Sequence, residues 1–245
     1  VSDRYMVTYF ISSSANGLYT AASKIPNFVI LFSQIFIDAW QLSAVDEYDQ
    51  EGGRQFFTKV FRVYSGGIFA VASVLILLCQ FITKILVAKS YYDSWQFVPI
   101  LIIATTFSCI VNFLASIYMA EKKNVMSLVT AMSGAITNFV LNLVFIPRIG
   151  ANGAALATVC AFLVVFVTRA IDTRRFIKID FKLPVLLGET AVLVTQSILL
   201  LKYDGTLWVY IIEVLLVVVM LLLNLKPIKE LVNLILAKFL KKRKN

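Results

Sequence analysis

The stretch Phe97–Met119 reads FVPILIIATTFSCIVNFLASIYM and contains 23 residues without a single charge. A helix rises about 1.5 Å per residue, so roughly 20 apolar residues cross the ~30 Å hydrocarbon core of a bilayer. A soluble domain could bury one or two such segments, but this chain has six more: Gly17–Val45, Gly66–Leu86, Val125–Ile146, Gly153–Ile171, Leu183–Leu201 and Leu207–Leu225. The sequence therefore predicts an all-α, polytopic membrane bundle of about seven transmembrane helices.

The composition agrees with a membrane protein and argues against several other classes. Hydrophobic residues make up 60% of the chain, and the mean hydropathy is +0.84. A net charge of +9 would suggest nucleic acid in a soluble protein, but here the basic residues flank the apolar runs. The chain has no His, and its three Cys lie in separate runs. We therefore expect no nucleic-acid partner, no metal site and no cofactor.

The distribution of Lys and Arg orients the predicted bundle. Seventeen of the 23 basic residues fall at one set of helix ends, including the C-terminus, and four fall at the opposite set. Cytoplasmic loops collect Lys and Arg, which places the C-terminus in the cytoplasm and Val1 outside. Aromatic residues favour the headgroup level, and they cluster at the expected outer ends: Tyr91, Tyr92, Trp95, Tyr203, Trp208 and Tyr210.

Two connections are predicted to lie on the membrane surface. Aromatic and aliphatic residues recur at helical spacing over 56–64, with basic residues between them. The segment 226–245 has an apolar stripe that ends in Lys241-Lys242-Arg243-Lys244. Both patterns are typical of helices on an anionic inner leaflet, and docking to a protein is the alternative for the tail.

The first run carries polar side chains on one face. An ionisable residue within a span usually faces a bundle interior or an aqueous cavity. Pro26 removes one backbone donor and predicts a kink near Lys24. The alternative is that Lys24 and Asp38 extend to the two interfaces from opposite helix ends. At 100° per residue, a face about 100° wide holds all five polar residues: Lys24, Asn27, Gln34, Asp38 and Gln41.

The remaining helices are predicted to be scaffold. Small and amide residues line one face of the run that begins at Val125, and small residues permit close helix packing. Glycine and alanine give the start of the following run a similar surface. Glu189 and Glu213 lie near the ends of otherwise apolar runs and are weaker site candidates.

Several short motifs resemble a known family of transporters. They are Ser2-Asp3-Arg4-Tyr5, Ala15-Asn16-Gly17-Leu18-Tyr19, Ala22-Ser23-Lys24-Ile25-Pro26, Asp38-Ala39-Trp40, Ser90-Tyr91-Tyr92, Glu121-Lys122-Lys123, and the succession Asn142–Pro147 and Gly150–Ala155. In this order they are similar to the second half of lipid-linked oligosaccharide flippases, which belong to the multidrug/oligosaccharidyl-lipid/polysaccharide exporter superfamily. The family's usual Pro shortly after Trp40 is absent, since Gln41 and Leu42 follow it.

The resemblance implies a protein about twice this length, with two lobes around a central cleft. This chain would be the C-terminal lobe, with its core at 1–171, two additional helices at 172–225 and a basic tail at 226–245. The implied activity is transfer of undecaprenyl-diphosphate-linked sugars across the bacterial cytoplasmic membrane for O-antigen or capsule synthesis. Its partners would be that lipid-linked oligosaccharide, the anionic inner leaflet and the missing N-terminal lobe.

The chemistry of the polar residues suits this activity. A diphosphate sugar cannot cross hydrocarbon unassisted and needs a hydrated cleft with cationic and amide groups. Lys24 and Arg4 could neutralise phosphate. The side-chain amides of Asn27, Gln34 and Gln41, which share a face with Asp38, could bond sugar hydroxyls. Alternating access is the general mechanism for such repeats.

Two other functions remain open from the sequence. A drug or cation antiporter of the same superfamily would favour acidic groups deep in the bundle rather than Lys24. A membrane-embedded glycosyltransferase or polymerase would carry large loops with catalytic acidic or His residues. The longest connection here is short and its acidic residues suit a solvated turn, so we do not expect an enzyme.

Overall fold

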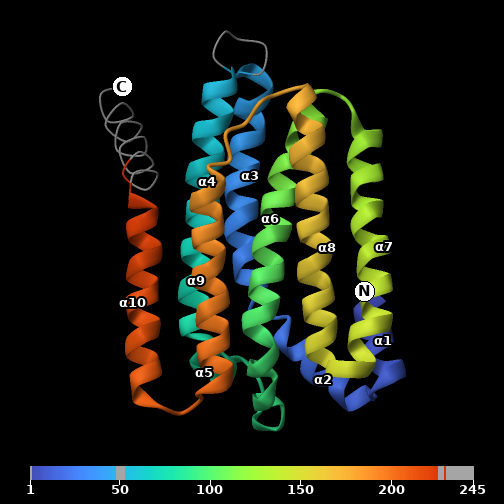
Figure 1. Cartoon of the computed structure of the whole chain (residues 1–245), viewed down its shortest axis with the longest axis vertical. Helices are drawn as coiled ribbons and strands as arrows, with labels where there is room; N and C mark the ends of the chain where they lie inside the picture. Colours follow the sequence, from blue (N-terminus) through green and yellow to red (C-terminus); the bar gives the residue numbers. More distant parts are fainter. Residues whose placement is uncertain (1, 48–52, 226–228, 230–245) are drawn as a thin grey trace.

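The computed structural model describes residues 2–47, 53–225 and 229, with the side chains of 39–54 left undescribed. Across this part of the chain the secondary structure is helical and contains no strand. Figure 1 shows long helices standing side by side, with several short helices gathered at one end of the bundle. The predicted all-α architecture is confirmed.

Five helical segments are long and apolar enough to cross a membrane. They contain α4 (Gly53–Leu77), α6 (Val98–Ala120) with the preceding 3₁₀ helix η1 (Lys89–Phe97), α7 (Asn124–Ile149), α8 (Ala151–Asp172) and α9 (Leu183–Lys202). Helix α10 (Leu207–Leu223) has 17 residues and so reaches only about 26 Å. By length and composition the described residues supply five spans, or six with a bent pair, rather than the seven predicted.

The bent pair is the first apolar run. It forms α2 (Ser13–Ala22) and α3 (Asn27–Glu47), which meet at an angle of 43°. Pro26 lies within the break, as predicted, because its ring cannot continue a helix and its nitrogen has no proton to donate. A separate short helix, α1 (Ser2–Phe10), precedes the pair.

The second run was bounded wrongly by the sequence pattern. Helix α4 begins at Gly53 rather than near Gly66, and it ends at Leu77, after which α5 (Cys79–Leu86) forms a separate short helix. The expected surface helix over 56–64 is therefore part of a span. Phe57, Phe61 and Tyr64 are fully buried there, and the rings of Phe61 and Tyr64 contact Phe113 of α6. Aromatic spacing alone could not separate an interfacial face from a core face.

Helix α6 is the centre of the bundle. Most of its residues are buried, and it contacts α3, α4, α7, α8 and α9. Its uncharged sequence reflects this position, since only a narrow face of the helix, which includes Asn112 and Met119, is left exposed. Helix α9 packs on α4 and α6, and α10 packs on α4 and α9, so the last two helices belong to the same bundle as the rest.

Helices α7 and α8 pack closely through glycine, as the small-residue pattern predicted. A Cβ on Gly153 would lie 2.5 Å from the carbonyl oxygen of Phe145, and a Cβ on Gly134 would lie 2.3 Å from Val165. Amides also bond across this interface, because the Asn138 side chain donates to the Thr158 hydroxyl over 3.3 Å.

The two predicted sets of helix ends lie at opposite ends of the bundle (Figure 1). We call them the basic end, which holds the connections around Lys122 and Arg174, and the aromatic end, which holds η1 and the α9–α10 turn. Tyr91, Tyr203 and Trp208 are exposed at the aromatic end, whereas Trp95 is buried in the core. The expected amphipathic tail at 226–245 lies outside the described residues, apart from Lys229.

Candidate functional site

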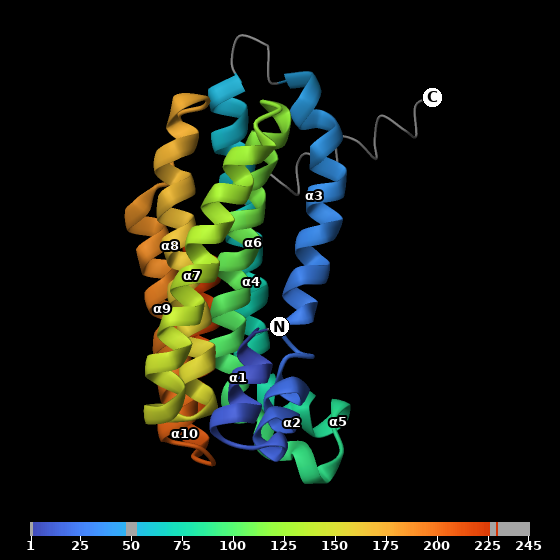
Figure 2. The ribbon, with the colours of Figure 1, turned by 90° about the vertical axis from the view of Figure 1, so that its right-hand side faces the viewer.

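Helix α3 holds most of the predicted site residues and packs on one side only. It lies at the edge of the bundle in Figure 2, against α4 and α6. Val29 and Ser33 are its buried residues within 27–38, and the Ser33 hydroxyl lies 2.5 Å from the Tyr64 hydroxyl. The rest of this stretch is exposed or half-buried. Because the packing face of α3 is narrow, most of the surface of this helix is exposed and available for a site.

The exposed side of α3 carries the polar stripe. Asn27, Gln34 and Asp38 are all exposed, and on the helix wheel they lie roughly opposite Val29. Exposed apolar residues flank them, among them Leu31 and Ile35. The side chain of Gln41 lies outside the described residues. A stripe of this kind is costly against lipid tails, so within a membrane it needs water or a polar partner.

Lys24 is separated from this stripe. It lies in the break between α2 and α3, where the single-helix wheel that grouped it with Asn27 does not apply. Its exposed side chain lines a hollow of about 520 Å³ at the aromatic end, formed by α2 and the connection from α5 into η1. The sequence grouped the five residues on one face, and the bend at Pro26 separates Lys24 from Asn27, Gln34 and Asp38.

Arg4 lies on α1 and is exposed. Its neighbour Asp3 is half-buried and is held by donors from two other helices. The Asn142 side-chain amide donates to Asp3 over 2.6 Å, and the Thr158 hydroxyl donates over 3.1 Å. Asp3 is therefore part of a polar cluster between α1, α7 and α8, which also contains Asn142 and Thr158.

This Asp3 cluster has the chemistry of a hard-cation ligand set. Asn142 is fully buried, and its side-chain oxygen has no hydrogen-bond partner among the described residues. Carboxylate, amide and hydroxyl oxygens are the ligands that hard cations prefer. A site with several acidic, His or Cys ligands is not present, since the described residues contain no group of three such side chains placed to hold a metal.

Arg169 is a buried polar residue whose position the sequence did not reveal. It was counted among the basic residues at a helix exit, yet it is 4% exposed. Its guanidinium donates to the carbonyl oxygen of Val111 over 2.7 Å, to the Thr130 hydroxyl over 3.0 Å and to the carbonyl oxygen of Ser127 over 3.1 Å. The side chain thereby joins α8 to α6 and α7, which is a structural role.

The weak candidates Glu189 and Glu213 are both buried. Gln196 donates to Glu213 over 2.8 Å and accepts from the Ser73 hydroxyl over 2.8 Å, which connects α4, α9 and α10. Glu189 lines a hollow of about 710 Å³ near the basic end, together with Arg62 and Lys182. Polar groups buried between transmembrane helices commonly form hydrogen bonds from one helix to another, as Ser73, Gln196 and Glu213 do here.

No protein-family model, curated protein or solved structure matches this chain. Three features of the described residues are candidate functional sites: the exposed polar stripe of α3, the hollow beside Lys24, and the Asp3 cluster.

Proposed function

We propose that this chain is one lobe of a two-lobe transporter that carries a lipid-linked oligosaccharide from the inner to the outer leaflet of a bacterial cytoplasmic membrane. The observation that carries the proposal is the polar stripe of α3, which is exposed on the side of the helix turned away from the bundle. A second lobe facing this side would enclose the stripe in a hydrated cleft. The motif resemblance gives the same arrangement.

The chemistry of the stripe suits a sugar head group. The Asn27 and Gln34 amides each offer donors and acceptors, which match the hydroxyl groups of a saccharide. The exposed apolar residues beside them suit contact with the opposite lobe or with the lipid tail. Lys24 at the aromatic end and Arg4 on α1, both exposed, would supply positive charge for phosphate.

The test is transport in vesicles by the protein that contains this chain. A fluorescent lipid-linked oligosaccharide would report transfer through its accessibility to a membrane-impermeant quencher. Gln34→Leu should slow transfer about fivefold at unchanged membrane levels, because a hydrogen bond contributes about 1 kcal/mol. Ile35→Leu is the matched control, since Ile35 is the neighbouring exposed apolar residue. Normal transfer by both Asn27→Leu and Gln34→Leu would exclude the stripe from the path.

The second candidate is a drug or cation antiporter, and the Asp3 cluster is the observation that favours it. A half-buried carboxylate held by Asn142 and Thr158 could exchange a cation. The same vesicles separate the two functions. An antiporter would move an organic cation against a sodium or proton gradient and lose this activity in Asp3→Asn, while the lipid-linked sugar would stay in its original leaflet.

A further inference from the structure

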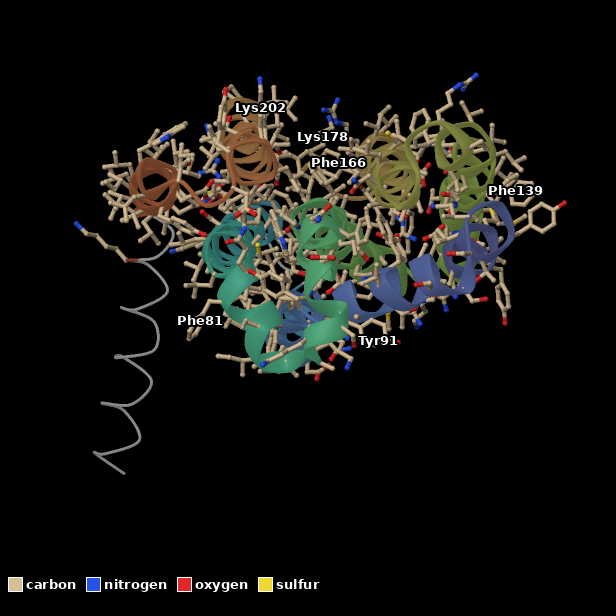
Figure 3. All side chains as sticks on the ribbon, turned by 90° about the horizontal axis from the view of Figure 1, so that it is seen from below. Phe81, Tyr91, Phe139, Phe166, Lys178 and Lys202 are labelled. Carbon is tan, nitrogen blue, oxygen red and sulfur yellow. The ribbon has the colours of Figure 1, made fainter. Side chains whose placement is uncertain are left out.

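We propose that the hollow beside Lys24 binds an acidic sugar unit, one that bears a carboxylate or a phosphate. This inference deepens the proposed function, since it names the class of head group that the aromatic end would receive. The hollow is formed by α2, the break before α3, and the connection between α5 and η1. Figure 3, seen from the aromatic end, shows Tyr91 on η1 beside α2. The described lining residues are Ser13, Asn16, Gly17, Thr20, Ala21, Lys24, Leu86, Val87, Ala88 and Tyr91.

The polar side of the hollow comes from one face of α2. Ser13, Asn16 and Thr20 recur at helical spacing and each presents a hydroxyl or an amide. The Thr20 hydroxyl donates to the Asn16 side-chain oxygen over 3.4 Å. This bond does not use the Asn16 amide protons, which can therefore donate to a ligand. Groups of this kind hydrogen-bond the hydroxyls of a sugar ring.

Tyr91 supplies an aromatic surface beside these groups. A Cβ on Gly17 would lie 3.2 Å from the Tyr91 ring, so the absent side chain of Gly17 lets the ring approach α2. Tyr91 is 43% exposed, which leaves part of the ring uncovered for a ligand. The apolar face of a pyranose can pack on such a ring while its hydroxyls reach the polar side of the hollow.

Lys24 determines the expected charge of the ligand. Among the described residues Lys24 forms no ion pair, and no acidic residue is among those that line the hollow. A single unpaired cation beside neutral donors favours an anion. The volume of about 520 Å³ is within the range of roughly 300–1,000 Å³ that small-ligand sites occupy.

The experiment measures binding of soluble probes to the full chain in nanodiscs of uncharged lipid. Saturation-transfer NMR titrations would compare glucuronic acid, glucose and glycerol 3-phosphate. Glucuronic acid should bind about tenfold more tightly than glucose, and Lys24→Gln should remove that difference because the charge-assisted bond is lost. Lys84→Gln is the matched control, since Lys84 is exposed on α5 at the same end and does not line the hollow.

A second variant separates a sugar from a lipid phosphate, which has the same charge. Tyr91→Ala should weaken both sugars severalfold and leave glycerol 3-phosphate unchanged, because only a ring can pack on the aromatic surface. The proposal is overturned if glucuronic acid has no advantage over glucose, if Lys24→Gln keeps that advantage, or if glycerol 3-phosphate binds as tightly as glucuronic acid and Tyr91→Ala affects neither. The NMR titrations measure binding and not transport. Failed binding together with intact transfer in vesicles would refute this site alone, whereas binding as expected together with failed transfer would refute the proposed function alone.

Discussion

Replacing Gly153 by alanine tests whether α7 and α8 are held together by backbone contact. The added Cβ would lie 2.5 Å from the carbonyl oxygen and 2.6 Å from the carbonyl carbon of Phe145, and 2.9 Å from the nitrogen of Ile146. Ordinary contacts are 3.4–4 Å. All three neighbours are backbone atoms, which cannot rotate away as a side chain can. The helices must therefore move apart or shift.

Overpacking of this kind costs about 1–3 kcal/mol, and backbone neighbours place Gly153→Ala at the upper end, about 3 kcal/mol. For a chain of this size about 1 kcal/mol corresponds to roughly 2–4 °C, so the Tm should fall by about 6–12 °C. Gly188→Ala is the matched control, because Gly188 lies within α9 and a Cβ there would meet nothing within 4 Å. Alanine is the better helix former by about 0.5–1 kcal/mol, so this variant should be slightly more stable than the wild type.

The assay is thermal unfolding of the purified chain in one detergent, followed by circular dichroism of the helical signal. A Gly153→Ala variant that melts with the wild type would refute the close approach of α7 and α8. A fall in Tm of equal size in Gly188→Ala would show instead that any added methyl group destabilises the protein in this detergent.

Three further perturbations test other parts of the structure. Arg169→Lys should lower the free energy of unfolding by about 2–3 kcal/mol in denaturant titrations, because one ammonium cannot reproduce these bonds to two neighbouring helices, and unchanged stability would contradict the buried position. The backbone amide of Lys182 holds the pKa of Asp180 below its ordinary value, with smaller help from Arg62. The contribution of the Asp180 carboxylate to the free energy of unfolding is therefore fully present above the unfolded pKa of about 3.9 and is lost as pH falls through the lower folded pKa. Asp180→Asn should remove this pH dependence from a series of melting curves. Cysteine placed at Lys202 should react with an impermeant reagent from outside intact cells and cysteine at Arg174 should not, whereas the reverse accessibility would invert the predicted orientation.

The sequence by itself determined the last five long helices and their order along the chain. The apolar runs beginning at Phe97, Val125, Gly153, Leu183 and Leu207 match α6 to α10 with ends within three residues. Long uncharged runs bounded by charge leave little freedom in where a span begins and ends. Pro26 likewise fixed the break in the first run, because proline cannot continue the backbone hydrogen bonds of a helix.

Only the tertiary structure decided which faces are covered. Phe57 and Phe61 were predicted to lie on the membrane surface and are instead packed in the core, since helical spacing shows which residues share a face and not what that face contacts. Lys24 was predicted to share a helix face with Asn27, yet it lies in a break with a bend of 43° and lines a hollow that Asn27 does not line. Arg169 had the sequence context of an exposed helix exit, and the acceptors that bury it come from residues 39 to 58 positions away in the chain. Hydropathy is a local property of the sequence, whereas burial depends on the neighbours that the fold brings together.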